Sequence, residues 1–198
     1  MALQTPSSDD AAPAPPDAPV FPCTVTSKNV KSGGDANDPW PLPDVLPTIS
    51  WRAGLDLNPL SVGDTADTRW LEQLIWPEHH ERRERFRQAC ARLRETPPTI
   101  EQGDLLADLP SLAARAPRDA TLVIFHSAVL AYVGESTLRD AFAETVRGLD
   151  AVWISNEVAG VFPAFARDLE RRRDRFLLCV NEEPVAWTGP HGQSLAWI

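Results

Sequence analysis

The stretch TLVIFH, residues 121–126, decides the fold class because it has the clearest strand character in the sequence. It is continuous, apolar and rich in β-branched residues, as expected of a strand that is covered on both faces. AVWISN, residues 151–156, has the same character, and an amphipathic segment that Ser136 can cap separates the two. This order of strand, helix and strand predicts two parallel strands joined by a right-handed crossover.

The segments on either side extend this alternation. Upstream, we predict a strand at 49–57, a helical region at 67–95 that Pro77 splits, a strand at 99–104 and a short helix at 109–115. Downstream, Pro163 can occupy the first turn of a helix, and RFLLCVN and PVAWTG then follow with no helix between them. We therefore expect a Rossmann-like α/β fold, with a mostly parallel sheet and a C-terminal antiparallel hairpin.

The first 47 residues differ in composition from the rest of the chain. Residues 1–19 are mostly Ala, Pro, Ser and Asp, which bury too little apolar surface to offset the entropy of ordering, so we expect a disordered tail. Residues 20–47 read as a Pro-rich irregular segment, with one short strand predicted at 21–30. The α/β domain is expected to span residues 48–198.

Charge and composition narrow the range of partners. The 198 residues include 28 acidic and 19 basic side chains, which gives a formal net charge of -9. This sign repels phosphate backbones and anionic membrane surfaces, so we expect neither nucleic acid nor a membrane as partner. We expect no secretory leader, and the sequence has no apolar run of about 20 residues. Its three scattered cysteines suit a reducing compartment, which predicts a cytoplasmic protein.

Polar residues follow several of the predicted strands. Ligands of parallel sheets collect beyond the carboxyl ends of the strands, so these residues are the candidates for a site. They are Asp56, Asn58, Asp104, His126, Ser127, Asn156 and Glu157.

Asp56 and Asp104 allow two interpretations. A carboxylate at a strand end can accept hydrogen bonds from the two hydroxyls of a ribose, or from the exocyclic amine of adenine. Alternatively, Asp56 or Asn58 forms an Asx turn, and Asp104 caps a turn or helix. The sequence leaves both interpretations open.

His126 is either a general base or a histidine held in place by hydrogen bonds. A serine-hydrolase site around Ser127 is disfavoured, because Phe125 and Val129 stand where a nucleophile elbow needs glycine. Asn156 and Glu157 either shape a substrate pocket or finish a loop.

We expect no metal site. The sequence Glu78-His79-His80-Glu81 invites that interpretation, but adjacent histidines on a helix point about 100° apart and cannot share an ion without distortion. His191 falls in the predicted turn of the final hairpin, and its role stays open.

Several motifs together resemble the bacterial domain-of-unknown-function family 2332. They are WRAGLDLNPL (51–60), WL (70–71), WPE (76–78), ERR (81–83), GD (103–104), FHSAVLAY (125–132), ISNE (154–157) and PHG (190–192). The resemblance covers about residues 48–198. The family in turn looks similar to class I S-adenosylmethionine-dependent methyltransferases.

The resemblance implies roles for the candidate residues. Asp56 would bind the ribose of S-adenosylmethionine and Asp104 its adenine, with Asn58 beside them as a further cofactor-binding candidate. His126 would stand beside the transferred methyl group, with Asn156 and Glu157 as further catalytic candidates.

The sequence departs from the methyltransferase pattern in two places. The gap between Asp56 and Asp104 is long, and no strand with a glycine-rich loop precedes residue 48, since Gly33-Gly34 cannot replace that loop. We therefore expect a sheet without its central strand, with the gap covered by residues 20–47, by a second copy or by a partner chain. Two hypotheses follow: a methyltransferase that acts on a small molecule, or a non-catalytic, truncated or degenerate module that associates with another chain.

Overall fold

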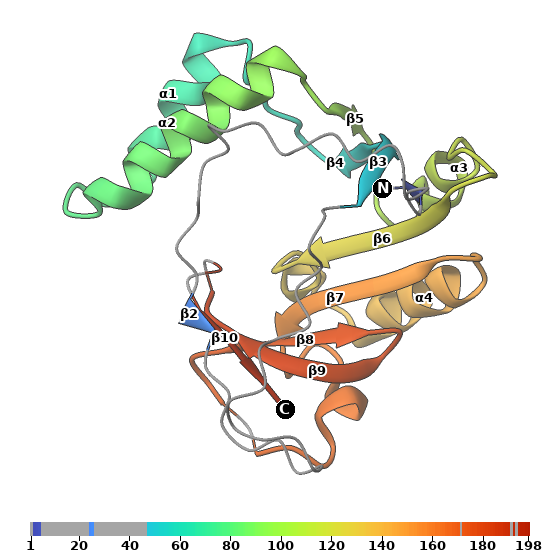
Figure 1. Cartoon of the computed structure of the whole chain (residues 1–198). Helices are drawn as coiled ribbons and strands as arrows, with labels where there is room; N and C mark the ends of the chain where they lie inside the picture. Colours follow the sequence, from blue (N-terminus) through green and yellow to red (C-terminus); the bar gives the residue numbers. More distant parts are fainter. Residues whose placement is uncertain (1, 5–23, 26–46, 171, 191, 193) are drawn as a thin grey trace. The chain divides into compact units, whose positions relative to one another are not determined.

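The structure is a computed structural model that describes residues 2–4, 24–25, 47–170, 172–190, 192 and 194–198 (Figure 1). The described residues fall into two compact units. Unit 1 contains residues 2–4, 24–25, 47–51 and the described part of 113–198, and unit 2 contains residues 52–112. His191, Gly33-Gly34 and most of the predicted tail and Pro-rich segment lie outside the described residues.

Unit 1 is built on one mixed sheet. Its strands are β1 (Ala2–Gln4), β2 (Thr24–Val25), β3 (Thr48–Trp51), β6 (Thr121–Ser127), β7 (Val152–Val158), β8 (Phe176–Val180), β9 (Glu183–Thr188) and β10 (Ser194–Trp197). They lie in the order β2-β10-β9-β8-β7-β6-β1-β3. The predicted strands at 121–126 and 151–156 are therefore confirmed as neighbours near the middle of this sheet.

The directions of the strands correct the expectation of a mostly parallel sheet. β6 and β7 are parallel, as predicted, with Val123 opposite Val152 and Ser127 opposite Asn156. The β2–β10 pair is also parallel, but all other neighbours described in this sheet are antiparallel. The physical reason is the connections: after β7 the described chain forms no crossover α-helix, so successive strands reverse. The described fold is thus mixed α/β, with a mostly antiparallel C-terminal sheet.

A tight turn joins β8 to β9, which confirms the predicted antiparallel pair. Its two central residues, Asn181 and Glu182, have φ of 48° and 72°. Positive φ at both positions matches the twist of a two-residue hairpin, and Asn tolerates it better than most residues. The amide oxygen of Asn181 accepts a hydrogen bond from the N–H of Trp153 at 2.8 Å, so the turn is tied to the start of β7.

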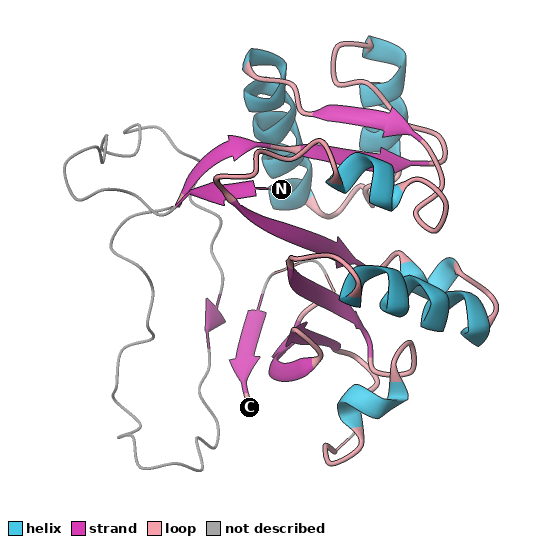
Figure 2. Cartoon of the chain, turned by 90° about the vertical axis from the view of Figure 1, so that its right-hand side faces the viewer, coloured by secondary structure: helices cyan, strands magenta, loops and turns pink. Residues whose placement is uncertain are grey.

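Helices cover one face of this sheet. The main one is α4 (Ser136–Arg147), which buries Phe142, Ala143 and Val146, and the short 3-10 helices η1 (Leu130–Tyr132) and η2 (Pro163–Ala166) follow β6 and β7 (Figure 2). Ser136 is the first helical residue and Glu135 is the N-cap, so the expectation that Ser136 caps this helix is wrong by one position. Pro163 stands at the start of η2, as predicted, but the expected crossover helix is here only a 3-10 helix of four residues.

Unit 2 contains a parallel pair of strands and two helices. β4 (Ala53–Asp56) pairs with β5 (Thr99–Gln102), and α1 (Thr65–Gln73) and α2 (His80–Glu95) lie between them in the sequence. The predicted break at Pro77 is confirmed. The single strand predicted at 49–57 is instead divided at Arg52 into β3 of unit 1 and β4 of unit 2. α3 (Leu109–Ala113) spans the boundary between the units.

The edge of β6 away from β7 carries a strand from the N-terminus. β1 pairs there in the antiparallel direction, with Ala2 opposite Leu122 and Leu3 opposite Thr121. β3 then pairs with β1. The described part of the Pro-rich segment that forms a strand, β2, pairs with β10 and does not lie beside β6. Among the described helices, none is long and apolar enough to cross a membrane.

Candidate functional site

Two of the predicted catalytic residues meet where β6 and β7 end. His126 and Glu157 project from the face of the sheet that α4 covers, and Nδ1 of the imidazole lies 2.9 Å from Oε1 of the carboxylate. Both side chains are buried, with 8% of His126 and 3% of Glu157 exposed. The parallel register of the two strands brings together residues that are far apart in the sequence.

The other imidazole nitrogen of His126, Nε2, is also hydrogen-bonded. The indole N–H of Trp153 donates to Nε2 of His126 at 2.9 Å. An indole nitrogen can only donate, so Nε2 must carry a lone pair and the proton must be on Nδ1. His126 is therefore held as the neutral Nδ1–H tautomer, which donates to Glu157. In this arrangement neither ring nitrogen is free to take a proton from a substrate.

Glu157 holds the turn that follows β6. In addition to His126, its Oε1 accepts the backbone N–H groups of Val129 at 3.0 Å and Leu130 at 3.1 Å. Ala128, just before them, has a φ of 54°, which marks the sharp change of chain direction. Oε2 of the same carboxylate is buried and has no hydrogen-bond partner among the described residues.

Aromatic rings pack around this hydrogen-bonded group. The ring of Phe142, from α4, meets His126 edge-on at 5.2 Å between centroids. Phe162 and Phe165 meet Trp153 edge-on at 5.6 and 5.8 Å. Edge-on packing of this kind adds to the burial of the rings and fixes their orientation. The His126 cluster, as we call His126, Trp153 and Glu157, is thus rigidly held.

Asn156 does not join the His126 cluster. Successive side chains of a strand point to opposite faces, so Asn156 and Glu157 cannot line one pocket from the same side. The Asn156 amide donates to Oγ of Ser127 at 3.0 Å, and its oxygen accepts from the Thr188 hydroxyl at 2.7 Å. These bonds connect β6, β7 and β9 on the sheet face opposite Glu157.

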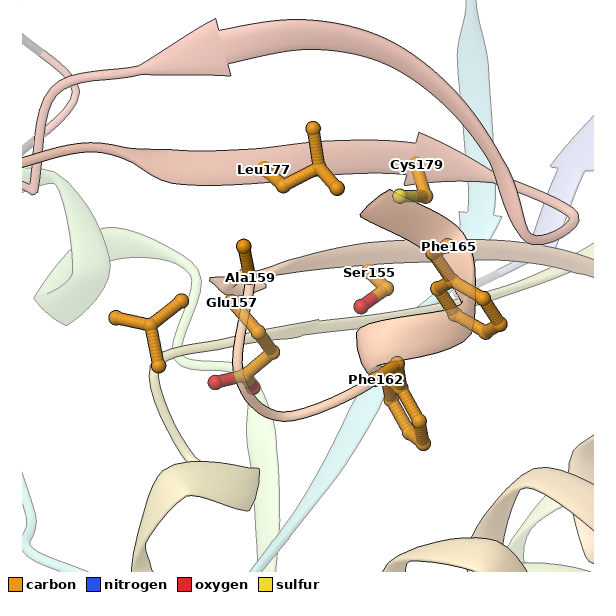
Figure 3. Close-up of a pocket in the computed structure, with 8 residues that line it drawn as sticks. Ser155, Glu157, Ala159, Phe162, Phe165, Leu177 and Cys179 are labelled. Atoms are coloured by element: carbon orange, nitrogen blue, oxygen red, sulfur yellow. The ribbon is translucent and has the colours of Figure 1, made fainter. Parts of the chain in front are cut away.

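A small cavity of about 10 Å³ lies beside Glu157 (Figure 3). Ser155 and Glu157 of β7 and Leu177 and Cys179 of β8 line it from the sheet, and Val158, Ala159, Phe162 and Phe165 complete it. This volume admits one group of the size of a water molecule. Burial raises the pKa of the Cys179 thiol to about 12, with the charge of Glu183 adding to the effect.

A larger cavity of about 310 Å³ lies near the start of β7. Its lining residues are Val146, Arg147, Leu149, Ala151, Trp153, Asn181 and Glu182. Arg147 donates to Glu182 at 2.5 Å and to Glu144 at 2.6 Å, and the hydrogen bond to Glu182 raises the pKa of the guanidinium. The charged groups of this cavity are therefore paired with each other.

The predicted cofactor-binding residues lie in unit 2. Asp56 ends β4 and Asp104 follows the neighbouring parallel strand β5, and the N–H of Gly103 donates to the Asp56 carbonyl at 3.0 Å. Oδ1 of Asp56 accepts the N–H of Asn58 at 2.8 Å, which forms an Asx turn. All three candidates, Asp56, Asn58 and Asp104, are exposed.

Asp104 also has a local role. Its Oδ1 accepts the N–H groups of Leu106 at 2.7 Å and Ala107 at 3.0 Å, and its own N–H donates to the Asp108 carboxylate at 2.8 Å. The local interpretation that the sequence left open is therefore present for both aspartates. In the described part of the chain, no hydrogen bond reaches Oδ2 of either one. No group of three or more His, Cys, Asp or Glu within these described ranges could hold a metal ion.

A family described as "Uncharacterized protein conserved in bacteria (DUF2332)" matches residues 21–197. The chain belongs to the DUF2332 family. No curated protein and no solved structure matches it. The resemblance drawn from the sequence motifs is thus confirmed at the level of the family.

Sequence reasoning missed one member of the site in this DUF2332 chain. Trp153 was expected only as an apolar residue of a buried strand, yet its N–H fixes the tautomer of His126. Side chains alternate between the two faces of a strand, so the sequence does predict that residues 153, 155 and 157 lie on the same face of β7. The identity of the indole's partner depends on how β6 and β7 are aligned, which the sequence does not specify.

Proposed function

We propose that this DUF2332 chain binds an adenosine-containing cofactor at the carboxyl ends of β4 and β5, with S-adenosylmethionine as the first candidate. One observation carries the proposal: exposed carboxylates lie at the carboxyl ends of two adjacent parallel strands, at Asp56 and Asp104. Carboxyl ends of parallel strands are where such sheets bind ligands, and a carboxylate accepts hydrogen bonds from the hydroxyls of a ribose.

The local hydrogen bonds support this role. The N–H of Asn58 holds Oδ1 of Asp56, so the carboxylate is already oriented while its Oδ2 can accept a ribose hydroxyl. Oδ1 of Asp104 is held in the same way by two N–H groups of the following turn. A side chain that is already ordered loses less entropy when it binds a ligand.

The proposed reaction is transfer of a methyl group to a small molecule that is yet to be identified. S-adenosylmethionine supplies an activated methyl group when bound. His126 would not remove a proton from the acceptor, because Trp153 and Glu157 occupy both of its ring nitrogens. Transfer would then depend on positioning the acceptor.

The test is thermal unfolding of the chain with and without S-adenosylhomocysteine, the demethylated form of the cofactor. At about 100 times the dissociation constant, binding adds about 2.7 kcal/mol of stability. We expect the melting temperature to rise for the unmodified chain and for a Glu78→Gln control, which removes an exposed acid elsewhere in unit 2. Asp56→Asn should abolish the rise, and an equal rise in that variant would contradict the proposed site.

The alternative of a non-catalytic module is favoured by a different observation. The predicted catalytic side chains are hydrogen-bonded to one another or to the sheet, and the described pairs between β1 and β6 are Ala2 with Leu122 and Leu3 with Thr121. Farther along β6, Phe125 is 59% exposed. We propose that a strand of a second copy adds to this edge, which is a common mode of association between sheets.

Light scattering after gel filtration tests this alternative. We expect a dimer whose dissociation constant rises at least tenfold in Phe125→Lys, because a charged residue on an edge strand opposes pairing. Tyr132→Lys is the matched control, since Tyr132 is 89% exposed and lies outside the strand. A monomer at all concentrations would exclude the second copy.

A further inference from the structure

We propose that the cavity beside Glu157 binds the ammonium group of a small primary amine. The site lies wholly within unit 1, uses no residue of β4 or β5, and goes beyond the proposed cofactor site. Three properties of the cavity support this assignment: the charge of Glu157, the free oxygen of its carboxylate, and the walls of the cavity.

The charge of Glu157 has no cation to balance it among the described residues. Its neighbour at ion-pair distance is His126, and the Trp153 contact keeps the proton off Nε2, so the imidazole is neutral. The two backbone N–H groups that reach Oε1 are neutral donors as well. A carboxylate that is only 3% exposed is costly to bury unless a positive group lies beside it.

One oxygen of the Glu157 carboxylate, Oε2, lacks a hydrogen-bond partner among the described residues. The donors from His126, Val129 and Leu130 all reach Oε1, while Oε2 is buried without a partner in the described structure. The side chain to which it belongs lines the cavity of about 10 Å³, as does Ser155, which precedes it on the same face of β7 (Figure 3). An ammonium group is close to water in size and carries three donors, so it can bond to Oε2 and to the Ser155 hydroxyl together.

The remaining walls suit a cation with a short apolar stem. Phe162 and Phe165 are stacked at 4.8 Å between centroids with an interplanar angle of 25°, and both line the cavity. Aromatic faces attract cations, most strongly where water is excluded. The cavity is only partly enclosed, so an alkyl stem can extend outwards. Quaternary ammonium groups are too large for the volume.

The experiment is a titration of the ¹⁵N-labelled full chain followed by the indole N–H signals of its tryptophans, with Trp153 assigned through Trp153→Phe. Methylammonium chloride should shift the Trp153 signal in a saturable way, because this indole bonds to the histidine that bonds to Glu157. Sodium chloride and tetramethylammonium chloride at equal ionic strength should not. Potassium chloride serves as a third salt, because K⁺ is a cation of similar size.

Two variants decide whether the carboxylate is responsible. Glu157→Gln keeps an oxygen for the His126, Val129 and Leu130 donors but removes the charge, so the saturable shift should disappear from a folded protein. Glu144→Gln removes an acid whose side chain is 74% exposed on α4, and the shift should remain.

Three results would overturn the proposal. One is no saturable shift with methylammonium, which would leave water as the occupant. Another is an equal shift with K⁺, which would make the site one for an inorganic cation. The third is an infrared band of a protonated carboxylic acid that is lost in Glu157→Gln, because a neutral Glu157 has no charge to balance.

Discussion

The indole N–H of Trp153 and Nε2 of His126 lie 2.9 Å apart, and this contact determines the protonation state of the histidine. A histidine that follows a buried parallel strand stands where a general base is often found. Here the Trp153 indole N–H bonds to one ring nitrogen of His126 and the Glu157 carboxylate bonds to the other. His126 therefore connects β6 with β7, and Glu157 connects both to the turn after β6. The consequences can be measured directly.

Replacement of Trp153 by Phe should lower the stability of the fold. The substitution leaves Nε2 of a buried imidazole without its donor, which costs about 1–3 kcal/mol, and the smaller ring adds the cost of a cavity. Urea unfolding measures the loss. The control is Trp76→Phe, because Trp76 is 69% exposed and its replacement should change stability by less than about 0.5 kcal/mol. Equal effects of the two substitutions would show that the indole hydrogen bond contributes nothing.

The tautomer of His126 is a second prediction. The proton should be on Nδ1, because Nε2 accepts the hydrogen bond of Trp153 while Nδ1 faces the Glu157 carboxylate. Long-range ¹H–¹⁵N correlation spectra distinguish the two neutral tautomers through the chemical shifts of the ring nitrogens. In Trp153→Phe the preference should weaken, since one of its two causes is removed. A protonated Nε2 in the unmodified chain would be incompatible with the described contact.

The parts of the fold that the sequence predicts are the local ones. The apolar stretch at 121–126, the break at Pro77 and the strands on either side of Asn181 each depend on neighbouring residues, and the structure confirms them. The parallel pairs β4–β5 and β6–β7 were also predicted correctly, but the antiparallel pairing of β7 with β8 was not, because strand direction depends on pairings between distant segments. The break at Arg52 also escaped prediction, since ISWRAGLDL has no residue that interrupts a strand.

In the candidate site, too, the sequence predicted the features that depend on neighbouring residues and missed those that depend on the pairing of distant segments. Sequence position correctly singled out His126 and Glu157 as polar groups at strand ends, and alternation along a strand places Asn156 on the opposite face. The Asx turn at Asp56 and the turn cap at Asp104 were among the alternatives, because they need only nearby backbone groups. The indole of Trp153 could not be paired with His126 without knowing the register of β6 and β7.

Cys179 should make the stability depend on pH in the alkaline range. Its pKa is raised to about 12 in the folded protein, mainly by burial, from an ordinary value of 9.0. Between these values the unfolded chain has lost the thiol proton that the folded chain still holds, so unfolding is favoured as pH rises. The slope that this thiol contributes to the free energy of unfolding is about 1.4 kcal/mol per pH unit.

Urea unfolding at several pH values above 9 tests the contribution of Cys179 by comparing two variants. Cys179→Ala should have a shallower decline of stability with pH than the unmodified chain, whatever its stability at neutral pH. Leu177→Ala, on the same strand and in the same buried cluster, should lower stability at every pH but leave the slope unchanged. Identical slopes for the unmodified chain and Cys179→Ala would contradict the raised pKa.

Asp104 should contribute to stability whether or not a cofactor binds. Its Oδ1 accepts two backbone N–H groups, from Leu106 and Ala107, so Asp104→Ala should cost about 1 kcal/mol, as the loss of a helix or turn cap does. Asp104→Asn keeps an acceptor oxygen and should recover most of this loss. Urea unfolding of both variants, followed by S-adenosylhomocysteine binding to Asp104→Asn, separates the two roles. If Asp104→Asn recovered stability but lost binding, the negative charge of Asp104 would be needed to bind the ligand. If Asp104→Asn recovered both stability and binding, Asp104 would act only as a cap. Asp56 would then be the remaining candidate for contact with the cofactor.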